Sequence, residues 1–86
     1  MGVELVPIGF NNIVAMNRVL AILNPDSQPV RRMIQEGRKS ERVIDATLGR
    51  RTKAVLLLDS GHLVLAALQP QTIAGRFDQH RGLEHA

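Results

Sequence analysis

The sequence of 86 residues contains no cysteine, no tryptophan and no tyrosine, and Phe10 and Phe77 are its only phenylalanines. Without cysteine there are no disulfides and no zinc or iron–sulfur sites built on thiolates. The shortage of aromatic rings removes the platforms on which single-stranded bases stack. No apolar run approaches the roughly 20 residues of a membrane-spanning helix. The lack of cysteine and of a signal peptide is typical of a reducing compartment, so we expect a cytoplasmic protein with no membrane partner.

The short length limits how this chain stabilises itself. A domain of this size buries only about 60% of the surface that its unfolded chain exposes. Small domains compensate with disulfides, metals or self-association, and the first of these is excluded here. Since 44% of the residues are hydrophobic, self-association is the stabilising route that we expect.

The charge is unevenly distributed along the chain. Residues 31–53 contain eight basic and three acidic residues, a net charge of +5, whereas the whole chain carries +3. Arginine outnumbers lysine nine to two, and its planar guanidinium suits phosphate oxygens and guanine edges. A basic segment of this kind is typical of a nucleic-acid binder. It is equally compatible with a solvated protein face, so charge alone leaves both interpretations open.

Hydrophobic periodicity predicts a small α+β domain with two helices. The first helix begins near Asp26 or Ser27, either of which can cap it, and the second begins at Pro70. The predicted strands are 3–8, 13–16, 19–23, 43–47, 52–58 and 62–68, of which 13–16 and 19–23 form either two strands or one bent strand. We expect a mostly antiparallel sheet within a single domain over residues 1–80, followed by a loose C-terminal tail over residues 81–86.

The strands 54–58 and 63–68 lack the alternation of apolar and polar residues that a sheet with one wet face shows. Both of their faces therefore need a cover. Two short helices screen part of this sheet, and we expect another subunit, rather than the helices alone, to cover the remainder.

The sequence offers no recognisable catalytic or metal-binding pattern. There is no glycine-rich phosphate loop of the common types. His62 follows a turn, which is typical of a hydrogen-bonded loop histidine, and the histidines near the C-terminus lack metal-site spacing. Asp45 and Asp59 are more typical of strand-edge and turn carboxylates than of an acid–base pair, and one of them is a candidate to hold an arginine in place. We therefore expect a non-enzymatic protein without a cofactor, and duplex DNA as the favoured nucleic acid.

Four segments of the chain resemble the RemA family of small bacterial regulators of extracellular-matrix genes. They are residues 8–14 (IGFNNIV), 29–35 (PVRRMIQ), 44–52 (IDATLGRRT) and 69–72 (QPQT). The resemblance runs from about Val3 to Phe77, and the Asp-Ala-Thr-x-Gly-Arg-Arg-Thr stretch is quite specific. The chain departs from the family at Asn11, where glycine is expected, and at Gln71, where an acidic residue is expected.

The resemblance implies a DNA-binding transcription activator that assembles into a ring and bends DNA around it. The arginine pair after the family's glycine corresponds to Arg50 and Arg51, which are the implied DNA contacts. Arg18 matches another family arginine that serves DNA binding or ring assembly. Pro29 matches a family proline that shapes the start of a helix.

Taken with the resemblance, the sequence predicts a ring-like homo-oligomer that binds promoter DNA, activates extracellular-matrix and biofilm genes, and is associated with the bacterial nucleoid. Arg32 and Lys53 are expected to add phosphate contacts to those of Arg50, Arg51 and Arg18. The alternative hypothesis is a structural module that uses its apolar strands and basic segment to bind other proteins.

Overall fold

The structure, a computed structural model, describes the backbone of residues 4–85 and the side chains of residues 4–78. In chain order its elements are β1 (Leu5–Gly9), β2 (Asn12–Ala15), the 3₁₀ helix η1 (Met16–Arg18), β3 (Val19–Leu23), α1 (Gln28–Lys39), β4 (Val43–Asp45), β5 (Ala54–Leu58), β6 (Leu63–Ala66) and α2 (Pro70–His85). The α+β class and the two helices are confirmed. Over the described residues, no helix is both long enough and apolar enough to cross a bilayer.

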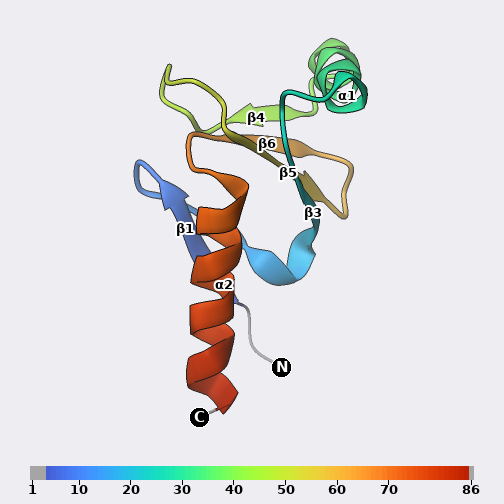
Figure 1. The fold of residues 1–86 in the computed structure, drawn as a ribbon. Helices are drawn as coiled ribbons and strands as arrows, with labels where there is room; N and C mark the ends of the chain where they lie inside the picture. Colours follow the sequence, from blue (N-terminus) through green and yellow to red (C-terminus); the bar gives the residue numbers. More distant parts are fainter. Residues whose placement is uncertain (1–3, 86) are drawn as a thin grey trace.

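The strands form two sheets rather than one. Strands β1 and β2 make a separate antiparallel hairpin, while the other four strands form a sheet in the order β3-β5-β6-β4 (Figure 1). Strand β4 pairs with β6 in parallel, and the remaining pairs are antiparallel. Helix α1 is the crossover that connects β3 to β4, so these two strands run in the same direction. Strand β6 also runs in this direction, because both it and β3 are antiparallel to β5, and β4 therefore pairs with β6 in parallel. The expected sheet is therefore mixed, with an antiparallel majority.

Helix α1 begins where the sequence predicts, after the capping residue Ser27. The Ser27 side chain accepts a hydrogen bond from the Val30 amide at 3.4 Å, and Pro29 lies in the first turn. Arg38 and Lys39 lie in the last turn, where the helix dipole favours positive charge. Val30 and Gly37 are buried. A Cβ atom at Gly37 would lie 3.0 Å from Val43 Cγ2, so glycine lets the helix approach β4 closely.

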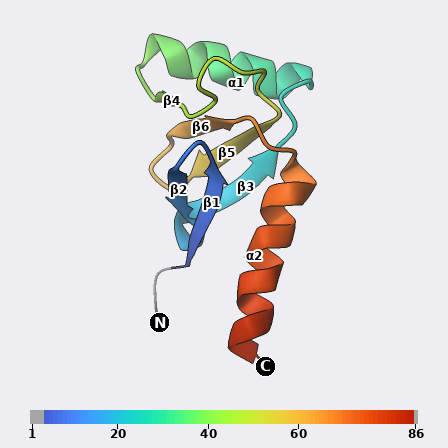
Figure 2. The same ribbon diagram turned by 90° about the vertical axis from the view of Figure 1, so that its left-hand side faces the viewer.

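Both faces of the two central strands, β5 and β6, are covered within the single chain. Helix α1 packs on one face, against Val55, Leu63 and Leu65, and the β1–β2 hairpin and α2 pack on the other (Figure 2). Residues 54–56 and 63–66 are consequently at most 6% exposed. The expectation that another subunit covers these two strands is wrong, because the β1–β2 hairpin supplies the layer that the helices lack.

Several boundaries differ from those predicted. The turn η1 separates β2 from β3, which resolves the choice between two strands and one bent strand. Strand β4 ends at Asp45 rather than Thr47, because the Asp45 carboxylate bonds to the Thr47 amide and turns the chain. Helix α2 runs to His85, so its backbone includes most of the tail predicted over 81–86. Gly82 alone lowers helix propensity by only about 1 kcal/mol and does not stop a helix.

Candidate nucleic-acid interface

The loop between β4 and β5, residues 46–53, is held in shape by Asp45 and Thr47. Asp45 Oδ1 accepts hydrogen bonds from the Thr47 hydroxyl at 2.6 Å and from the Thr47 amide at 2.9 Å. These two bonds, together with the charge of Arg38, lower the pKa of the Asp45 carboxyl. Thr47 is only 2% exposed. The loop is also tied to β6 at both ends, through Ala46 N–H to Leu65 O and Lys53 N–H to Ala66 O.

The tip of this loop is a tight turn with unusual backbone angles. The Arg50 amide donates to Thr47 O at 3.0 Å, and the two central residues, Leu48 and Gly49, have φ values of +53° and +79°. Positive φ at both central positions defines the type I′ turn, which prefers Asn-Gly. Leucine pays about 1–2 kcal/mol for this conformation. The turn projects beyond the sheet (Figure 1) and places Arg50 and Arg51 at its base.

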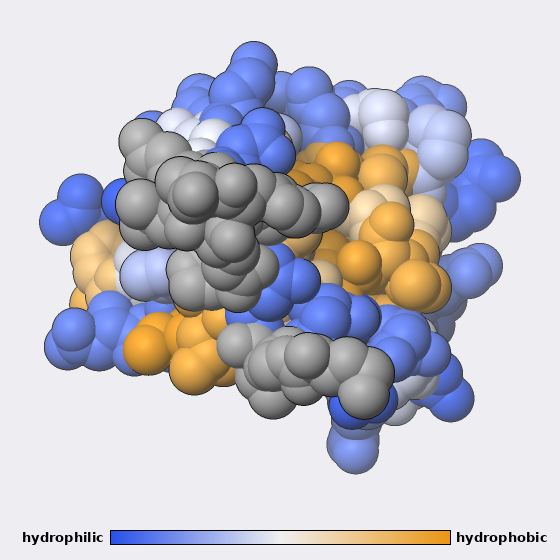
Figure 3. All heavy atoms as spheres, turned by 90° about the horizontal axis from the view of Figure 1, so that it is seen from below, coloured by the Kyte–Doolittle hydropathy of each residue, from blue (hydrophilic) through white to orange (hydrophobic). Residues whose placement is uncertain are grey.

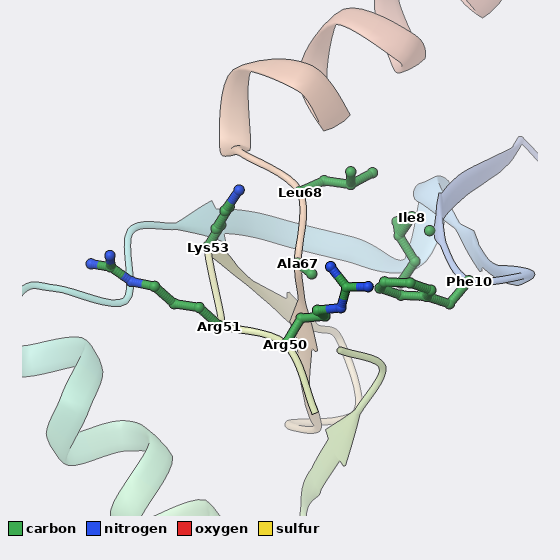
Figure 4. Close-up of a pocket in the computed structure, with 8 residues that line it drawn as sticks. Ile8, Phe10, Arg50, Arg51, Lys53, Ala67 and Leu68 are labelled. Atoms are coloured by element: carbon green, nitrogen blue, oxygen red, sulfur yellow. The ribbon is translucent and has the colours of Figure 1, made fainter. Parts of the chain in front are cut away.

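Three cationic residues of this loop contribute to the lining of an open cavity of about 450 Å³. Arg50, Arg51 and Lys53 line one side, and the remaining lining residues are Ile8, Gly9, Phe10, Ala67 and Leu68 (Figure 4). The cavity thus combines an apolar wall with a cationic one. None of the three cations forms a salt bridge with any described residue. Their charge is therefore available to an anion in solution.

Arg50 is oriented by the tip of the β1–β2 hairpin. Its guanidinium lies 5.8 Å from the centroid of the Phe10 ring, within the range of a cation–π contact. Phe10 and Asn11 form this hairpin turn with φ values of +53° and +65°. The Asn12 side-chain amide donates to Gly9 O at 3.2 Å and to Ala46 O at 3.5 Å, which links the hairpin to the basic loop.

Arg51 extends away from Arg50, toward the connection between β3 and α1 (Figure 4). There it lines a second, polar hollow of about 150 Å³ with Lys53, Thr52, Gln69 and the Asn24–Asp26 segment. The two neighbouring arginines thus present their charge on different sides of the loop. We call Arg50, Arg51 and Lys53 the loop cations.

The structure places Arg18 away from the loop cations. Its Nε donates to Asp59 Oδ2 at 2.6 Å, an exposed ion pair that raises the pKa of Arg18 and lowers that of Asp59. Because Val19 pairs with Leu58, Arg18 lies at the opposite end of β5 from Lys53. The length of β5 separates them by about 17 Å at about 3.4 Å per residue. Asp59 therefore holds an arginine in place, as the sequence suggested for one of the two aspartates.

Arg32 is exposed on α1, where it lines a shallow hollow with Gln28, Arg31 and Gln35. It belongs to neither hollow that the loop cations line. Of the five predicted contact residues, the structure groups only Arg50, Arg51 and Lys53. His62 accepts or donates a hydrogen bond to the Ser60 hydroxyl at 2.8 Å, as expected of a loop histidine. The part of the chain with described side chains holds no group of three or more residues fit to bind a metal.

Sequence reasoning missed the roles of Phe10 and of the Asp45–Thr47 bonds. The spacing Asp-x-Thr is typical of an aspartate that bonds to the amide two residues on, so the bonds between Asp45 and Thr47 could have been predicted from the sequence. The contact between Phe10 and Arg50 had none, because it joins two turns that are 40 residues apart in the chain.

Comparison with known proteins adds to this description. Residues 5–77 match the RemA-like family, described as extracellular matrix regulatory protein A-like. A protein of Dehalococcoides mccartyi is 60% identical over 82 residues, which cover 95% of this chain and 85% of that protein. A Cyanothece protein is 53% identical over 90% of this chain and 85% of its own length. A Trichormus variabilis protein is 48% identical over 99% of this chain and 100% of its own length. All three carry the name "Putative regulatory protein". The basic loop lies within the matched residues, and the chain is a member of the RemA-like family of regulatory proteins.

Proposed function

We propose that this protein is a DNA-binding transcription regulator that acts without catalysis, as a ring-like homo-oligomer on promoter DNA at the bacterial nucleoid, and activates extracellular-matrix genes. The observation that carries the proposal is the set of loop cations, which are exposed, unpaired among the described residues and brought to one projecting loop. Membership of a family of regulatory proteins supports the regulatory part of the proposal.

The loop cations suit phosphate groups in both charge and geometry. Two of the three are arginines, whose guanidinium groups form paired hydrogen bonds with phosphate oxygens. Among the residues with described side chains, Phe10 is the one that contacts the Arg50 guanidinium, and an aromatic ring leaves the donors of the guanidinium free. The hydrogen bonds of Asp45 and Thr47 fix the loop before binding, which lowers the entropy lost on association.

A single protomer offers too few contacts for tight binding. With a handful of phosphate contacts, its dissociation constant is expected at about 10⁻⁴ to 10⁻⁶ M in physiological salt. Repetition of the loop around an oligomer raises the avidity by about 10² to 10⁴ when the DNA reaches several copies. Self-association is therefore part of the proposed mechanism.

A surface for self-association is available at strand β3. This strand is an edge of the four-stranded sheet, and between it and α2 lies a groove of about 340 Å³ lined by Met16, Phe77 and residues 19–22. Leu20 in this groove is 67% exposed. Seen from below, hydrophobic surface gathers in a broad area of the molecule (Figure 3). An exposed strand edge beside an apolar groove favours a contact between copies of the chain.

The proposal is tested by duplex binding of the wild type and of Arg50→Ala/Arg51→Ala across a range of salt concentrations. We expect the slope of log affinity against log salt to fall in magnitude by about 1.8 for every protomer that contacts the DNA, since each phosphate contact contributes about 0.9. Lys39→Ala/Arg42→Ala, at two exposed positions between the end of α1 and β4, removes the same charge and serves as the control. Light scattering checks that the assembly keeps its size.

Two results would contradict the proposal. Unchanged binding by the loop variant, or a loss no larger than that of the control, would exclude the loop as the contact surface. No duplex binding by the wild type at low salt would favour the alternative of a protein-interaction module, for which the exposed Leu5, Ile13 and Leu20 side chains provide apolar surface.

A further inference from the structure

Leu48 occupies the tip of the basic loop at an unfavourable position for a leucine. It is 76% exposed, the largest exposed fraction among the large hydrophobic residues whose side chains are described. Its φ of +53° belongs to the left-handed region, which side chains with a Cβ atom rarely adopt. Exposure to water and the positive φ therefore both disfavour leucine here, whereas asparagine is polar and is preferred at this position of a type I′ turn.

The loop enforces this unfavourable arrangement. The Thr47 amide and hydroxyl are bonded to Asp45 just before Leu48, and the Arg50 amide closes the turn onto Thr47 O just after it. Strained residues that a rigid surrounding maintains are concentrated at functional sites. The apolar side chain is thus held outward, on a turn that projects beyond the sheet (Figure 1).

The residues next to Leu48 indicate which kind of ligand its side chain contacts. Arg50 and Arg51 follow it at the base of the turn, and their side chains extend in different directions, toward Phe10 and toward the β3–α1 connection (Figure 4). An apolar tip with diverging cations at its base matches a duplex, in which stacked bases lie between two phosphate backbones. Architectural DNA-binding proteins insert leucine and similar side chains between base steps in the same way.

We propose that Leu48 is a wedge that inserts between two stacked base pairs and kinks the DNA while Arg50 and Arg51 bind the flanking phosphates. This inference rests on the proposed function. It adds a source of sequence preference that phosphate contacts lack, because pyrimidine–purine steps such as TA and CA unstack more readily than others. Binding sites should therefore place such a step opposite the loop.

Leu48→Asn removes the wedge without removing the turn. Asn-Gly is the preferred pair in a type I′ turn, so this variant should fold at least as well as the wild type. Leu48→Met keeps an apolar side chain of similar volume and serves as the matched control. Both variants retain Arg50 and Arg51.

The measurement uses duplexes that carry 2-aminopurine beside a central TA step, with an otherwise identical duplex lacking pyrimidine–purine steps at its centre for comparison. Fluorescence of 2-aminopurine rises when the base unstacks, and energy transfer between dyes at the duplex ends reports the bend. We expect Leu48→Asn to lose the fluorescence rise and the bend, and to bind the TA duplex about tenfold more weakly, as for the loss of one sequence-reading contact. Leu48→Met should retain most of the fluorescence rise, of the bend and of the affinity for the TA duplex.

The salt dependence separates this proposal from the proposed function. Leu48→Asn should keep the wild-type salt slope and assembly mass, because the phosphate contacts remain. Unchanged unstacking and bending in Leu48→Asn would overturn the wedge and leave DNA binding intact. A smaller assembly in Leu48→Asn would assign Leu48 to a contact between subunits and likewise overturn it. Absence of duplex binding by the wild type would overturn the proposed function itself.

Discussion

Arg50 of the basic loop and Phe10 of the β1–β2 hairpin have different roles at the candidate interface. Arg50 carries a charge that no described carboxylate neutralises, and Phe10 restricts where this charge lies without masking its hydrogen-bond donors. Phe10 is 43% exposed, so the contact is worth about 0.5–1 kcal/mol, the value for a cation–π pair at an exposed site. Its contribution should therefore be to position Arg50 rather than to stabilise the fold.

Replacement of Phe10 tests this positioning role. Phe10→Leu removes the aromatic face, and we expect duplex affinity to fall by about two- to fivefold, the equivalent of 0.5–1 kcal/mol, while the unfolding midpoint changes little. Phe10→Tyr keeps the ring and should bind as the wild type does. Fluorescence anisotropy with a labelled duplex measures both. Equal binding by the leucine and tyrosine variants would refute a role for the ring.

Asp45 makes the loop sensitive to acid. Hydrogen bonds from Thr47 lower the pKa of Asp45 in the folded protein below its unfolded value of about 3.9. The stabilisation by this carboxylate is therefore complete above about pH 4 and is lost as the pH falls through the folded pKa. The loop should be fully ordered at neutral pH.

We expect the Thr47 amide resonance to titrate with a midpoint below about 3.9, the ordinary value for aspartate. Asp45→Asn keeps an oxygen that accepts from the Thr47 amide but has no charge to lose, so its Thr47 resonance should not titrate in this range. An NMR titration between neutral and strongly acidic pH measures both proteins. A wild-type midpoint at or above the ordinary value would contradict the bonds described for Asp45.

At the scale of elements, the covering of the four-stranded sheet depends on the hairpin β1–β2 and on α2. Helix α2 is fixed by Ile73, which is fully buried, and by the Arg76 guanidinium, which donates to Pro7 O at 3.0 Å. The hairpin inserts Val6 and Ile8 into the same apolar cluster. These two elements therefore form one layer that supports both the sheet and the Phe10 turn.

Ile73→Ala should destabilise the protein by about 2–5 kcal/mol, the range for removal of a buried isoleucine side chain. Ile13→Ala is the matched control, since Ile13 is 62% exposed and the same substitution on a surface changes stability by about 0.5 kcal/mol or less. Urea unfolding followed by circular dichroism measures both. Similar values for the two variants would show that α2 does not close this layer.

At the scale of the whole molecule, the loop cations and the apolar groove beside β3 lie in different places. The loop cations gather between β4 and β5, whereas the apolar groove runs between β3 and α2. The two are separate enough to serve different partners at once. This separation allows the proposed assembly to form through β3 while each subunit keeps its basic loop free for DNA.

Leu20→Glu should reduce the mass of the assembly measured by light scattering, because it places a charge in the apolar groove. The protomer should remain folded, since Leu20 is 67% exposed. Loss of avidity should then weaken duplex binding by about 10² to 10⁴. Gln71→Glu makes the same change in charge at an exposed position of α2 and should alter neither property. An unchanged mass in Leu20→Glu would remove Leu20 from the subunit contact.

The sequence by itself determined the elements whose signals are local. Ser27 and Pro29 mark the start of α1, the non-alternating residues 54–58 and 63–68 mark buried strands, and Gly49 followed by two arginines marks an exposed basic turn. Each of these features depends on the chemistry of neighbouring residues, so it can be predicted without knowledge of the fold. The requirement that both faces of the central hairpin be covered was also correctly predicted.

Only the tertiary structure decided what covers that hairpin and which charges act together. The cover is the β1–β2 hairpin with the two helices. The prediction that a second subunit covers these strands failed because sequence periodicity shows that a face is buried but not which segment lies on it. The register of β3 against β5 assigns Arg18 to Asp59, and the packing of two turns assigns Arg50 to Phe10. Contacts between distant segments depend on the packing of the whole chain, and for that reason composition and spacing do not contain them.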